Sequence, residues 1–579
     1  MVAFVFESKL NSLTQRKPMI TAFWLACWSI SVSLAWLLPN HYPPWSTFHV
    51  DAWMAIVLSL AAAAVIVRAP GTVLWHGITV LAAFLVLVPA LQFGLGLILS
   101  PATAWISSAY LLGFLLALLT GARWESTSTG QLPDGLFLSI GIAALLSVGL
   151  QLHQWLGLNL LDIWSMGDGF GRPFANFGQP NNLGTFLLWG LLATGWGIAR
   201  QRIGVWSAVF IAAYLLFGLA LTQSRTAWLA VALLIAASWI WKSLWSDRRW
   251  PWVVTGLGVY FTLCVMSLGW LNHLLGLTLS TDVGDIVRIS SEQRPAVWAL
   301  FLDAALQRPW LGYGWNQVVL AQLTASIDHP ALHTVFSHSH NLFLDLVLWC
   351  GIPFGLFVSL YLIRWFWLRL RAVRCAEDAV LMLFLLVVGN HAMLELPLHH
   401  AYFLLPTGLV MGALHVRLQV RPILATGRWS YVGIWLVSAL LLGFLIRDYS
   451  RVETSYQALR FEWARIKYHT RGTPPEVLLL TQWRDFIALA RFEPPSQMTA
   501  QELDWLRRVN STTPSTGGFH KLAAALAMNK QPIEAQLWLR RACKIVSATQ
   551  CEALRSAWAQ QSLSNPDIAA VAWPVTKED

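Results

Sequence analysis

Charged side chains are scarce in this sequence. Only 12% of its 579 residues are Asp, Glu, Lys or Arg, whereas 56% are hydrophobic. A soluble domain carries about 25% charged residues, so this shortage argues against a large soluble protein. Apolar runs of roughly 20 residues recur along the chain, which is the length at which a helix crosses a bilayer. The composition therefore predicts an all-α polytopic membrane protein embedded in the lipid bilayer.

Cysteine is also rare, with six residues and no Cys-x-x-Cys pair. Without a His/Cys cluster at ligand spacing, metal binding by these cysteines is disfavoured. Cys543 and Cys551 both lie in the charged tail, where an oxidising compartment would allow a disulfide between them. The four cysteines that lie in apolar runs or in a basic loop, where we expect free thiols, are Cys27, Cys264, Cys350 and Cys375.

A continuous basic stripe is absent as well, although the net charge is +10. The Lys and Arg residues form short clusters between apolar runs. This is the positive-inside pattern of membrane proteins and not a path along nucleic-acid phosphates. We therefore expect no nucleic acid among the partners of this protein.

Hydropathy predicts about thirteen membrane-spanning segments. The first follows Lys9, Arg16 and Lys17. It is too long for the core of a signal peptide and no small-residue cleavage site follows it, so we expect it to be retained. The predicted segments are residues 19–38, 52–67, 73–91, 102–119, 136–152, 182–199, 203–221, 227–241, 252–271, 342–363, 379–396, 402–416 and 431–446.

Positive charge is concentrated in alternate loops between these segments. Because cytoplasmic loops carry the excess of Lys and Arg, the alternation predicts a multi-pass protein of the bacterial inner membrane with a cytoplasmic N-terminus. Thirteen crossings then place the C-terminal tail in the periplasm. The basic residues on the predicted cytoplasmic side are Arg68, Arg123, Arg200, Arg202, Lys242, Arg248, Arg249 and the clusters within 364–374 and 417–428.

We expect the chain to form two domains. Residues 1–446 form the transmembrane domain, with a large periplasmic loop at 272–341, and residues 447–579 form a charged periplasmic helical domain. Within that domain, residues 520–541 predict a helix–turn–helix pair that resembles a tetratricopeptide unit, although no clean period of about 34 residues is present. A protein-docking module and a small helical domain packed on the membrane part both fit this pattern.

Three arginines lie on the predicted outer side, against the trend of the loops. Arg225 lies at the outer end between two spans, and Arg288 and Arg294 lie in the large loop. Guanidinium groups bind phosphate oxygens through paired hydrogen bonds, so arginines beside lipid favour a pyrophosphate-lipid head group. Snorkelling to the interface or a local salt bridge is the structural alternative.

Further polar residues gather at the outer ends of later spans. His338 and His340 precede the tenth span, where a histidine suits a general base near neutral pH, and Asn341 also suits a helix cap. His391 and Glu395 are four residues apart, so a continuous helix would place them on one face as a structural or a functional pair.

Amide side chains are concentrated just before the sixth span. The stretch at 174–182 reads Phe-Ala-Asn-Phe-Gly-Gln-Pro-Asn-Asn. Its Gly and Pro predict a loop-to-helix turn. The amides, among them Gln179, are suited to sugar hydroxyls.

Together these stretches resemble the bacterial O-antigen ligase superfamily, and within it the O-linking protein oligosaccharyltransferases. The histidine and arginine elements are typical of the whole superfamily, whereas Gly-Gln-Pro-Asn and Glu-Leu-Pro-Leu-His are typical of the protein-glycosylating branch. The resemblance is carried by Asn-Phe-Gly-Gln-Pro-Asn at 176–181, Ser-Arg at 224–225, Arg-Pro-Ala-Val-Trp at 294–298, Gly-Tyr-Gly-Trp at 312–315, His-Ser-His-Asn at 338–341 and Glu-Leu-Pro-Leu-His-His-Ala-Tyr-Phe at 395–403.

The resemblance implies a metal-independent transferase without a cofactor. It would move a preassembled glycan from undecaprenyl pyrophosphate to Ser or Thr hydroxyls of periplasmic proteins, such as a pilin-like subunit. Arg225 and Arg294 would hold the pyrophosphate and stabilise the charge that develops as it leaves. His340 would face the acceptor hydroxyl, with His338 as the rival for that role. The other residues expected to bind substrate are Gln179, Tyr402, Asn341, Arg288 and Glu395.

Other functions also fit the sequence. An O-antigen ligase, which acts on lipid A core sugar, and an O-antigen polymerase share the arginines and an outer-face site. A transporter of polyprenyl-linked glycans belongs to another class, for which internal repeats are typical. We find no convincing internal symmetry in this chain.

Overall fold

The computed structural model describes residues 22–69, 71–158, 160–165, 172–245, 247–277, 283–466 and 472–574, with side chains from residue 294 onward in the segment that begins at 283. Nearly all of its regular structure is helical, so the predicted fold class, an all-α polytopic membrane protein, is confirmed. Two short strands, β1 (Val73–Trp75) and β2 (Leu424–Thr426), pair antiparallel with Val73 opposite Thr426.

Each of the thirteen predicted segments contains a helix. The first three residues of the first segment, 19–21, lie outside the described part of the chain. Eight of the described helices are long and apolar enough to cross a membrane. The helices of these segments are α2 (Ala22–Ala35), α3 (Phe48–Arg68), α4 (Gly77–Gly94), α5 (Pro101–Thr127), α6 (Gln131–Trp155), α7 (Pro180–Ala199), α8 (Val205–Leu221), α9 (Arg225–Ile240), α10 (Trp250–Leu274), α13 (Leu342–Cys350), α14 (Ile352–Ala372), α15 (Ala376–Ala392), α16 (Ala401–Arg417) and α17 (Arg428–Trp463).

The tenth predicted segment is broken into two helices, α13 and α14, at Gly351. Gly351 has φ +80°, and a Cβ at this position would lie 2.2 Å from the carbonyl oxygen of Trp310. Only glycine fits such a left-handed backbone in contact with another chain segment. The amide of Ile352 donates to the carbonyl of Pro309 at 2.6 Å. The break therefore lets the large loop pack directly against the start of a span.

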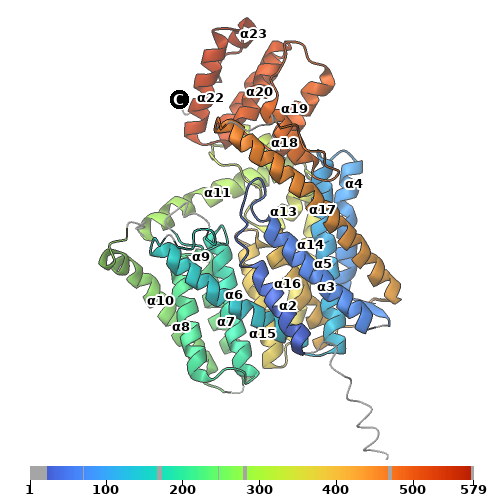
Figure 1. Ribbon diagram of the computed structural model, residues 1–579, viewed down its shortest axis with the longest axis vertical. Coiled ribbons are helices and arrows are strands. Elements are labelled where there is room, and N and C mark those ends of the chain that lie inside the picture. The colour runs from blue at the N-terminus through green and yellow to red at the C-terminus, as the bar shows by residue number, and fades with distance from the viewer. Residues whose placement is uncertain are drawn as a thin grey trace, which may run out of the picture.

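Helices α2–α10 and α13–α17 form one bundle, and α11 (Val283–Gln307) lies across one end of it (Figure 1). We call this end, next to the C-terminal helices, the upper end. At the lower end Arg417 is paired with Glu125 at 3.0 Å and with Glu377 at 2.7 Å, and Arg200 with Asp134 at 3.1 Å. Arginines from different predicted cytoplasmic loops thus lie at the same end of the bundle.

Helix α17 continues without interruption past residue 446, where we placed the end of the membrane part. Its 36 residues correspond to about 54 Å at 1.5 Å per residue, whereas the hydrocarbon core is only about 30 Å thick. A rigid helix therefore joins the bundle to the tail. The C-terminal helices beyond it are α18 (Thr481–Arg491), α19 (Ala500–Thr512), α20 (Thr516–Met528), α21 (Pro532–Ile545), α22 (Ala548–Ser562) and α23 (Pro566–Ala569).

The tail and the large loop share one apolar core. The expected helix–turn–helix pair is present as α20 and α21, and the core around it includes Leu323 of α12 (Val318–Ala325), which is followed by the short helix η1 (Ser326–Asp328). Cys543 and Cys551 form a disulfide between α21 and α22, and the four cysteines expected to be free are free. The tail therefore packs directly against the large loop.

Candidate active site

Glu395 lies at the upper end, in the turn between α15 and the short helix η2 (Pro397–His399). Helix α15 ends at Ala392, and Pro397 prevents it from continuing past the turn, because proline disfavours helical backbone in the residue before it and cannot donate within a helix. Glu395 therefore lies beyond the helix that carries His391, and the expected continuous helix face is wrong, although the Glu395 amide still donates to the His391 carbonyl at 2.8 Å. His391 is fully buried and bonds through Nδ1 to the Thr185 hydroxyl at 2.8 Å.

The carboxylate of Glu395 is the point where three parts of the chain meet. Its Oε2 accepts a hydrogen bond from Nδ1 of His340 at 3.0 Å and one from Nε2 of Gln179 at 3.4 Å. Its Oε1 accepts from Nδ2 of Asn181 at 3.3 Å and lies 3.6 Å from Nη2 of Arg294. Motifs that are far apart in the sequence thus converge on one carboxylate.

The charge of Glu395 is stabilised where it lies. Burial alone would raise the pKa of Glu395, but the hydrogen bond and the electrostatic interaction with His340 lower it to about 2. The carboxylate is therefore ionised at neutral pH. An ionised carboxylate on Nδ1 keeps the other ring nitrogen of His340, Nε2, available as a proton acceptor, as in hydrolase triads.

His340 is held in an unusual backbone conformation, with φ +61°. A left-handed non-glycine residue costs free energy, and such residues cluster at functional sites. The Nδ1 of His338 accepts from the His340 amide at 3.3 Å. Burial and then the charge of His340 lower the pKa of His338 to about 4. Of the two rival histidines, His340 is thus the one that has a carboxylate partner.

Arg225 is the first residue of α9, directly after Ser224, whose hydroxyl caps the helix and donates to Oδ1 of Asn181 at 2.6 Å. Arg294 lies in α11, and its positive charge acts on Arg225. The expected pair of outer arginines therefore lies close enough to interact, on the side of Glu395.

Arg172 is a third arginine in this cluster, and it was not predicted from the sequence. Its Nε and Nη2 donate to the carbonyl of Thr222 at 2.9 and 2.7 Å. Burial and then the charge of Arg225 lower the pKa of Arg172 to about 10, while the charge of Glu395 acts in the opposite direction. The rule that singled out Arg225, a cation in a predicted outer segment, applied equally to Arg172.

The remaining residues predicted to bind substrate are Tyr402, Asn341 and Arg288. The hydroxyl of Tyr402 accepts from Nδ2 of Asn182 at 3.4 Å, and its ring stacks on His400. The side chain of Asn341 accepts from the amides of Phe343 and Leu344 and so caps α13. Arg288 lies within α11, and its side chain lies outside the described residues.

Asp51 is a buried carboxylate in α3 that was not predicted from the sequence either. Its Oδ1 accepts from the Ala401 amide at 2.6 Å, and its Oδ2 accepts from the hydroxyls of Tyr110 and Thr47, each at 2.9 Å. Asp51 therefore holds the start of α16, where Tyr402 lies. Ionisable residues inside membrane spans are energetically costly and are therefore candidates for a functional role, and this criterion would have selected Asp51 from the sequence.

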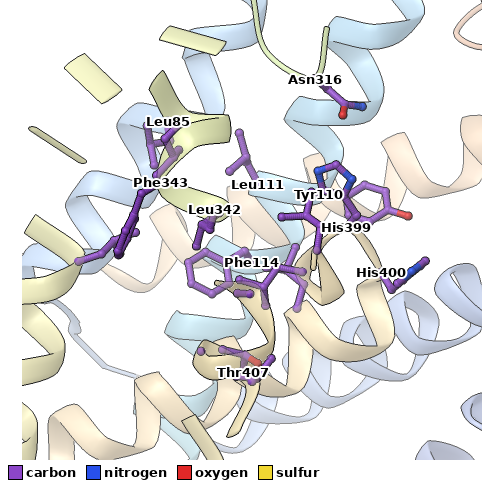
Figure 2. A pocket seen from close by; sticks show the side chains of 18 of the residues that line it. Leu85, Tyr110, Leu111, Phe114, Asn316, Leu342, Phe343, His399, His400 and Thr407 are labelled. Carbon is purple, nitrogen blue, oxygen red and sulfur yellow. The ribbon is translucent and has the colours of Figure 1, made fainter. Parts of the chain in front are cut away.

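A cavity of about 1160 Å³ adjoins this cluster and runs between α4, α5, α9 and α13–α16. Met393, Leu394 and Leu396, the neighbours of Glu395, line it. Figure 2 shows Asn316 and His399 beside the apolar side chains of Leu111 and Phe114. Among the described lining residues none is Asp, Glu, Lys or Arg. This cavity suits an uncharged, apolar ligand next to a charged cluster.

His338, His340 and Glu395 could also hold a divalent cation, since one ligand atom from each lies within 4.8 Å of the others. Two imidazoles and one carboxylate are a ligand set that zinc accepts. The hydrogen bond between His340 and Glu395 accounts for part of this proximity without a metal. The same geometry therefore also serves as an acid–base pair beside cations.

Three family profiles match parts of the chain. The family described as "O-Antigen ligase" matches residues 210–359, "Protein glycosylation ligase" matches 173–196, and "Virulence factor membrane-bound polymerase, C-terminal" matches 379–557. The first match contains Arg225, Arg294 and His340, and the second contains Gln179. The matched residues thus include most of the site.

Two curated relatives come from Acinetobacter baylyi. The chain is 30% identical over 532 residues to a protein named "General O-oligosaccharyltransferase", covering 88% of this chain and 90% of the relative. It is 32% identical over 248 residues to a "ComP-specific O-oligosaccharyltransferase", covering 42% of this chain and 44% of the relative. The first similarity extends over most of both chains.

Proposed function

The chain belongs to the O-oligosaccharyltransferase family of glycan-transferring membrane enzymes, and on this basis we propose that it moves a preassembled glycan from undecaprenyl pyrophosphate to Ser or Thr hydroxyls of periplasmic proteins. The observation that carries the proposal is the His340–Glu395 pair beside Arg172, Arg225 and Arg294. It combines a proton acceptor with a cluster of phosphate-binding cations at one end of a membrane protein.

In the proposed reaction the acceptor hydroxyl oxygen attacks the anomeric carbon of the glycan. The bond from this carbon to the pyrophosphate oxygen breaks, and the hydroxyl proton passes to Nε2 of His340. Glu395 holds the imidazole through Nδ1 and stabilises the imidazolium that forms. Because the leaving group is a good one, positioning of the two substrates supplies much of the rate.

The arginines bind the pyrophosphate in this proposal. Guanidinium forks match phosphate oxygens, and in a partly buried site they stabilise the charge that grows on the leaving group. The polyprenyl chain binds in the neighbouring uncharged cavity. Leu229 and Leu233, which line this cavity, belong to α9, the helix that begins at Arg225. The site then lies on the periplasmic face of the inner membrane, where polyprenyl-linked glycans and secreted acceptors meet.

An O-antigen ligase is the second candidate, because that family's profile matches residues 210–359. The cluster of arginines and His340 would serve a sugar hydroxyl of lipid A core as well as a protein hydroxyl. The acceptor is therefore the part of the proposal that an experiment must decide.

The test is co-expression with a polyprenyl-linked glycan pathway and a tagged pilin-like protein, followed by intact-protein mass measurement. We expect the acceptor to gain the mass of the glycan, and His340→Ala to abolish the gain while the enzyme remains folded in the membrane. His273→Ala, at an exposed position in the last turn of α10, is the control and should be active. Glycan on lipid A with unmodified protein would support the ligase instead.

Metal independence is tested separately with the purified enzyme. We expect EDTA to leave the transfer rate unchanged, because the arginine cluster supplies the positive charge for the leaving group. A loss of activity that zinc restores would instead assign a cation to His338, His340 and Glu395.

A further inference from the structure

The loop that carries His338 and His340 has no regular structure of its own. Every residue from 329 to 341 is described, and none of them belongs to a helix or a strand. His333 and His340 both have positive φ values, +51° and +61°. A segment with two left-handed non-glycine residues keeps its shape only through contacts with its surroundings.

One set of contacts comes from α12. The side chain of Gln322 is fully buried; its Nε2 donates to the carbonyl of Thr334 at 2.7 Å, and its Oε1 accepts from the amide of Phe336 at 2.8 Å. The ring of Phe336 then packs edge-on against His340, with 5.6 Å between centroids. This set holds the second half of the loop.

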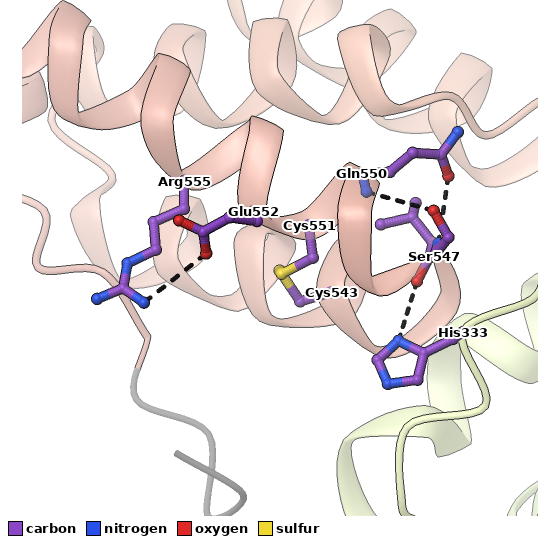
Figure 3. Close-up of a disulfide and its surroundings, with 8 residues drawn as sticks. His333, Cys543, Ser547, Gln550, Cys551, Glu552 and Arg555 are labelled. Carbon is purple, nitrogen blue, oxygen red and sulfur yellow. Dashed lines mark hydrogen bonds and ion pairs between the residues drawn. A yellow bond between two sulfur atoms is a disulfide. The ribbon is translucent and has the colours of Figure 1, made fainter.

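The other set comes from the C-terminal tail. The carbonyl of Lys544 accepts from the amides of Leu332 and His333 at 3.1 and 3.3 Å, and Nδ1 of His333 donates to the carbonyl of Val546 at 3.2 Å. Figure 3 shows His333 pointing at the turn between α21 and α22, beside the disulfide. Among the described residues, these hydrogen bonds to Leu332 and His333 come from the tail, whereas His329 at the start of the loop contacts Asp303 of α11 at 3.1 Å.

The Cys543–Cys551 disulfide closes that turn. It joins the end of α21 to the first residues of α22, with 5.0 Å between the two Cα atoms, and Lys544 directly follows Cys543. The two carbonyls that hold the loop therefore lie inside a ring closed by a covalent bond. A crosslink restricts the positions that such a turn can adopt.

From these contacts we infer that His333 and the disulfide-closed turn 543–551 position the histidine loop for the transfer reaction. The disulfide fixes the turn, the turn fixes Leu332 and His333, and the loop then presents His340 to Glu395. His333 acts through His340 and is a positioning residue. The inference rests on the proposed function only for its effect on rate.

The first test measures the loop itself. In the purified full-length enzyme, hydrogen–deuterium exchange of peptides within 329–341 should rise in the double variant Cys543→Ser/Cys551→Ser. The same rise is expected in His333→Ala, which leaves the disulfide intact. Cys375→Ser, an exposed free cysteine elsewhere, is the control and should exchange like the wild type.

The second test measures turnover with the tagged pilin-like acceptor. Both variants should transfer glycan about tenfold more slowly at saturating acceptor, with KM for the acceptor unchanged, since misplacement of a reacting group affects the chemical step. His333→Asn should recover most of the rate, because Asn tolerates positive φ and can donate to Val546.

The outcomes separate this inference from the proposed function. Exchange in 329–341 that stays at the wild-type level would overturn the inference, whatever the enzyme modifies. Increased exchange with a wild-type rate would overturn it too, because the loop would then not need the turn. A wild-type enzyme that modifies no acceptor would instead refute the proposed function and leave the exchange result standing.

Discussion

At the scale of single residues, Glu395 has the most connected role in the site. It accepts hydrogen bonds from His340, Gln179 and Asn181 and lies beside Arg294. A buried carboxylate is costly unless several partners satisfy it. In the proposed reaction these partners bind substrate or accept the proton, so we expect the carboxylate both to assemble the site and to orient the proton acceptor.

Glu395→Gln should therefore lower the transfer rate by about 100-fold or more, because the amide can hold the wrong tautomer of His340. The pKa of Glu395 is about 2, so the carboxylate is ionised between about pH 5 and 8, and the variant should be slower than the wild type throughout this range. Rates of glycan transfer across this range are the measurement.

Glu453→Gln is the matched control, since Glu453 forms a similar pair with Nε2 of His49 at 2.9 Å away from the site. It should transfer glycan at the wild-type rate. A Glu395→Gln enzyme with full activity would rule out the orienting role.

Arg172→Gln should reduce kcat/KM for the lipid-linked donor by about 10- to 100-fold, because one phosphate-binding cation is lost. Burial lowers the pKa of Arg172 and so opposes the stabilisation from its two hydrogen bonds to Thr222, and the variant should melt close to the wild type. Arg202→Gln at the lower end is the control. Lower melting with unchanged kcat/KM would show that Arg172 is structural.

At the scale of elements, the junction between α11 and α13 determines where Arg294 lies. Gly312 has φ +69°, and a Cβ there would lie 2.4 Å from the carbonyl oxygen of Leu348. The next amide, that of Tyr313, donates to the same carbonyl at 2.7 Å. The Gly-Tyr-Gly-Trp stretch therefore fastens the end of α11 to the helix that follows the histidine loop.

Gly312→Ala should lower the free energy of unfolding by about 1–3 kcal/mol and slow transfer, because the strained backbone must shift α11 away from α13. Thermal melting and transfer rates are the measurements. Gly269→Ala in α10, where an added Cβ meets nothing within 4 Å, is the control and should be neutral or stabilising. Equal melting of the two variants would contradict this account of the junction.

At the scale of the whole molecule, the two ends of the bundle differ in chemistry. The lower end carries arginines paired with Asp134, Glu125 and Glu377, and the upper end carries the site and the tail. We expect the lower end to face the cytoplasm, since basic loops are retained there. With this orientation, we expect the long helix α17 to carry the tail into the periplasm.

Labelling in intact cells with a membrane-impermeant maleimide tests this orientation. Leu563→Cys, at a position that is 90% exposed in the tail, should be labelled, whereas the exposed native Cys375 should react only after the cells are broken. Labelling of Cys375 alone in intact cells would reverse the orientation.

The sequence by itself determined the helices and the family, because hydropathy, loop charge and short motifs are local properties of the chain. Each of the thirteen apolar segments contains a helix. Arg225, Arg294, His340 and Gln179 could be selected in the same way, as polar residues in outer segments. The sequence also indicated a Cys543–Cys551 disulfide as one possibility, because both cysteines lie in the same charged tail.

Only the tertiary structure decided how these residues meet. Gln179 and Glu395 are 216 positions apart, and their hydrogen bond depends on the packing of α7 against α15. The expected helix face shared by His391 and Glu395 is absent because α15 ends before Glu395, and the Glu395 carboxylate bonds to His340 instead. The support of the histidine loop by Lys544 and Val546 was equally invisible, because backbone carbonyls carry no sequence signal. Long-range packing, and not residue type, assembled the site.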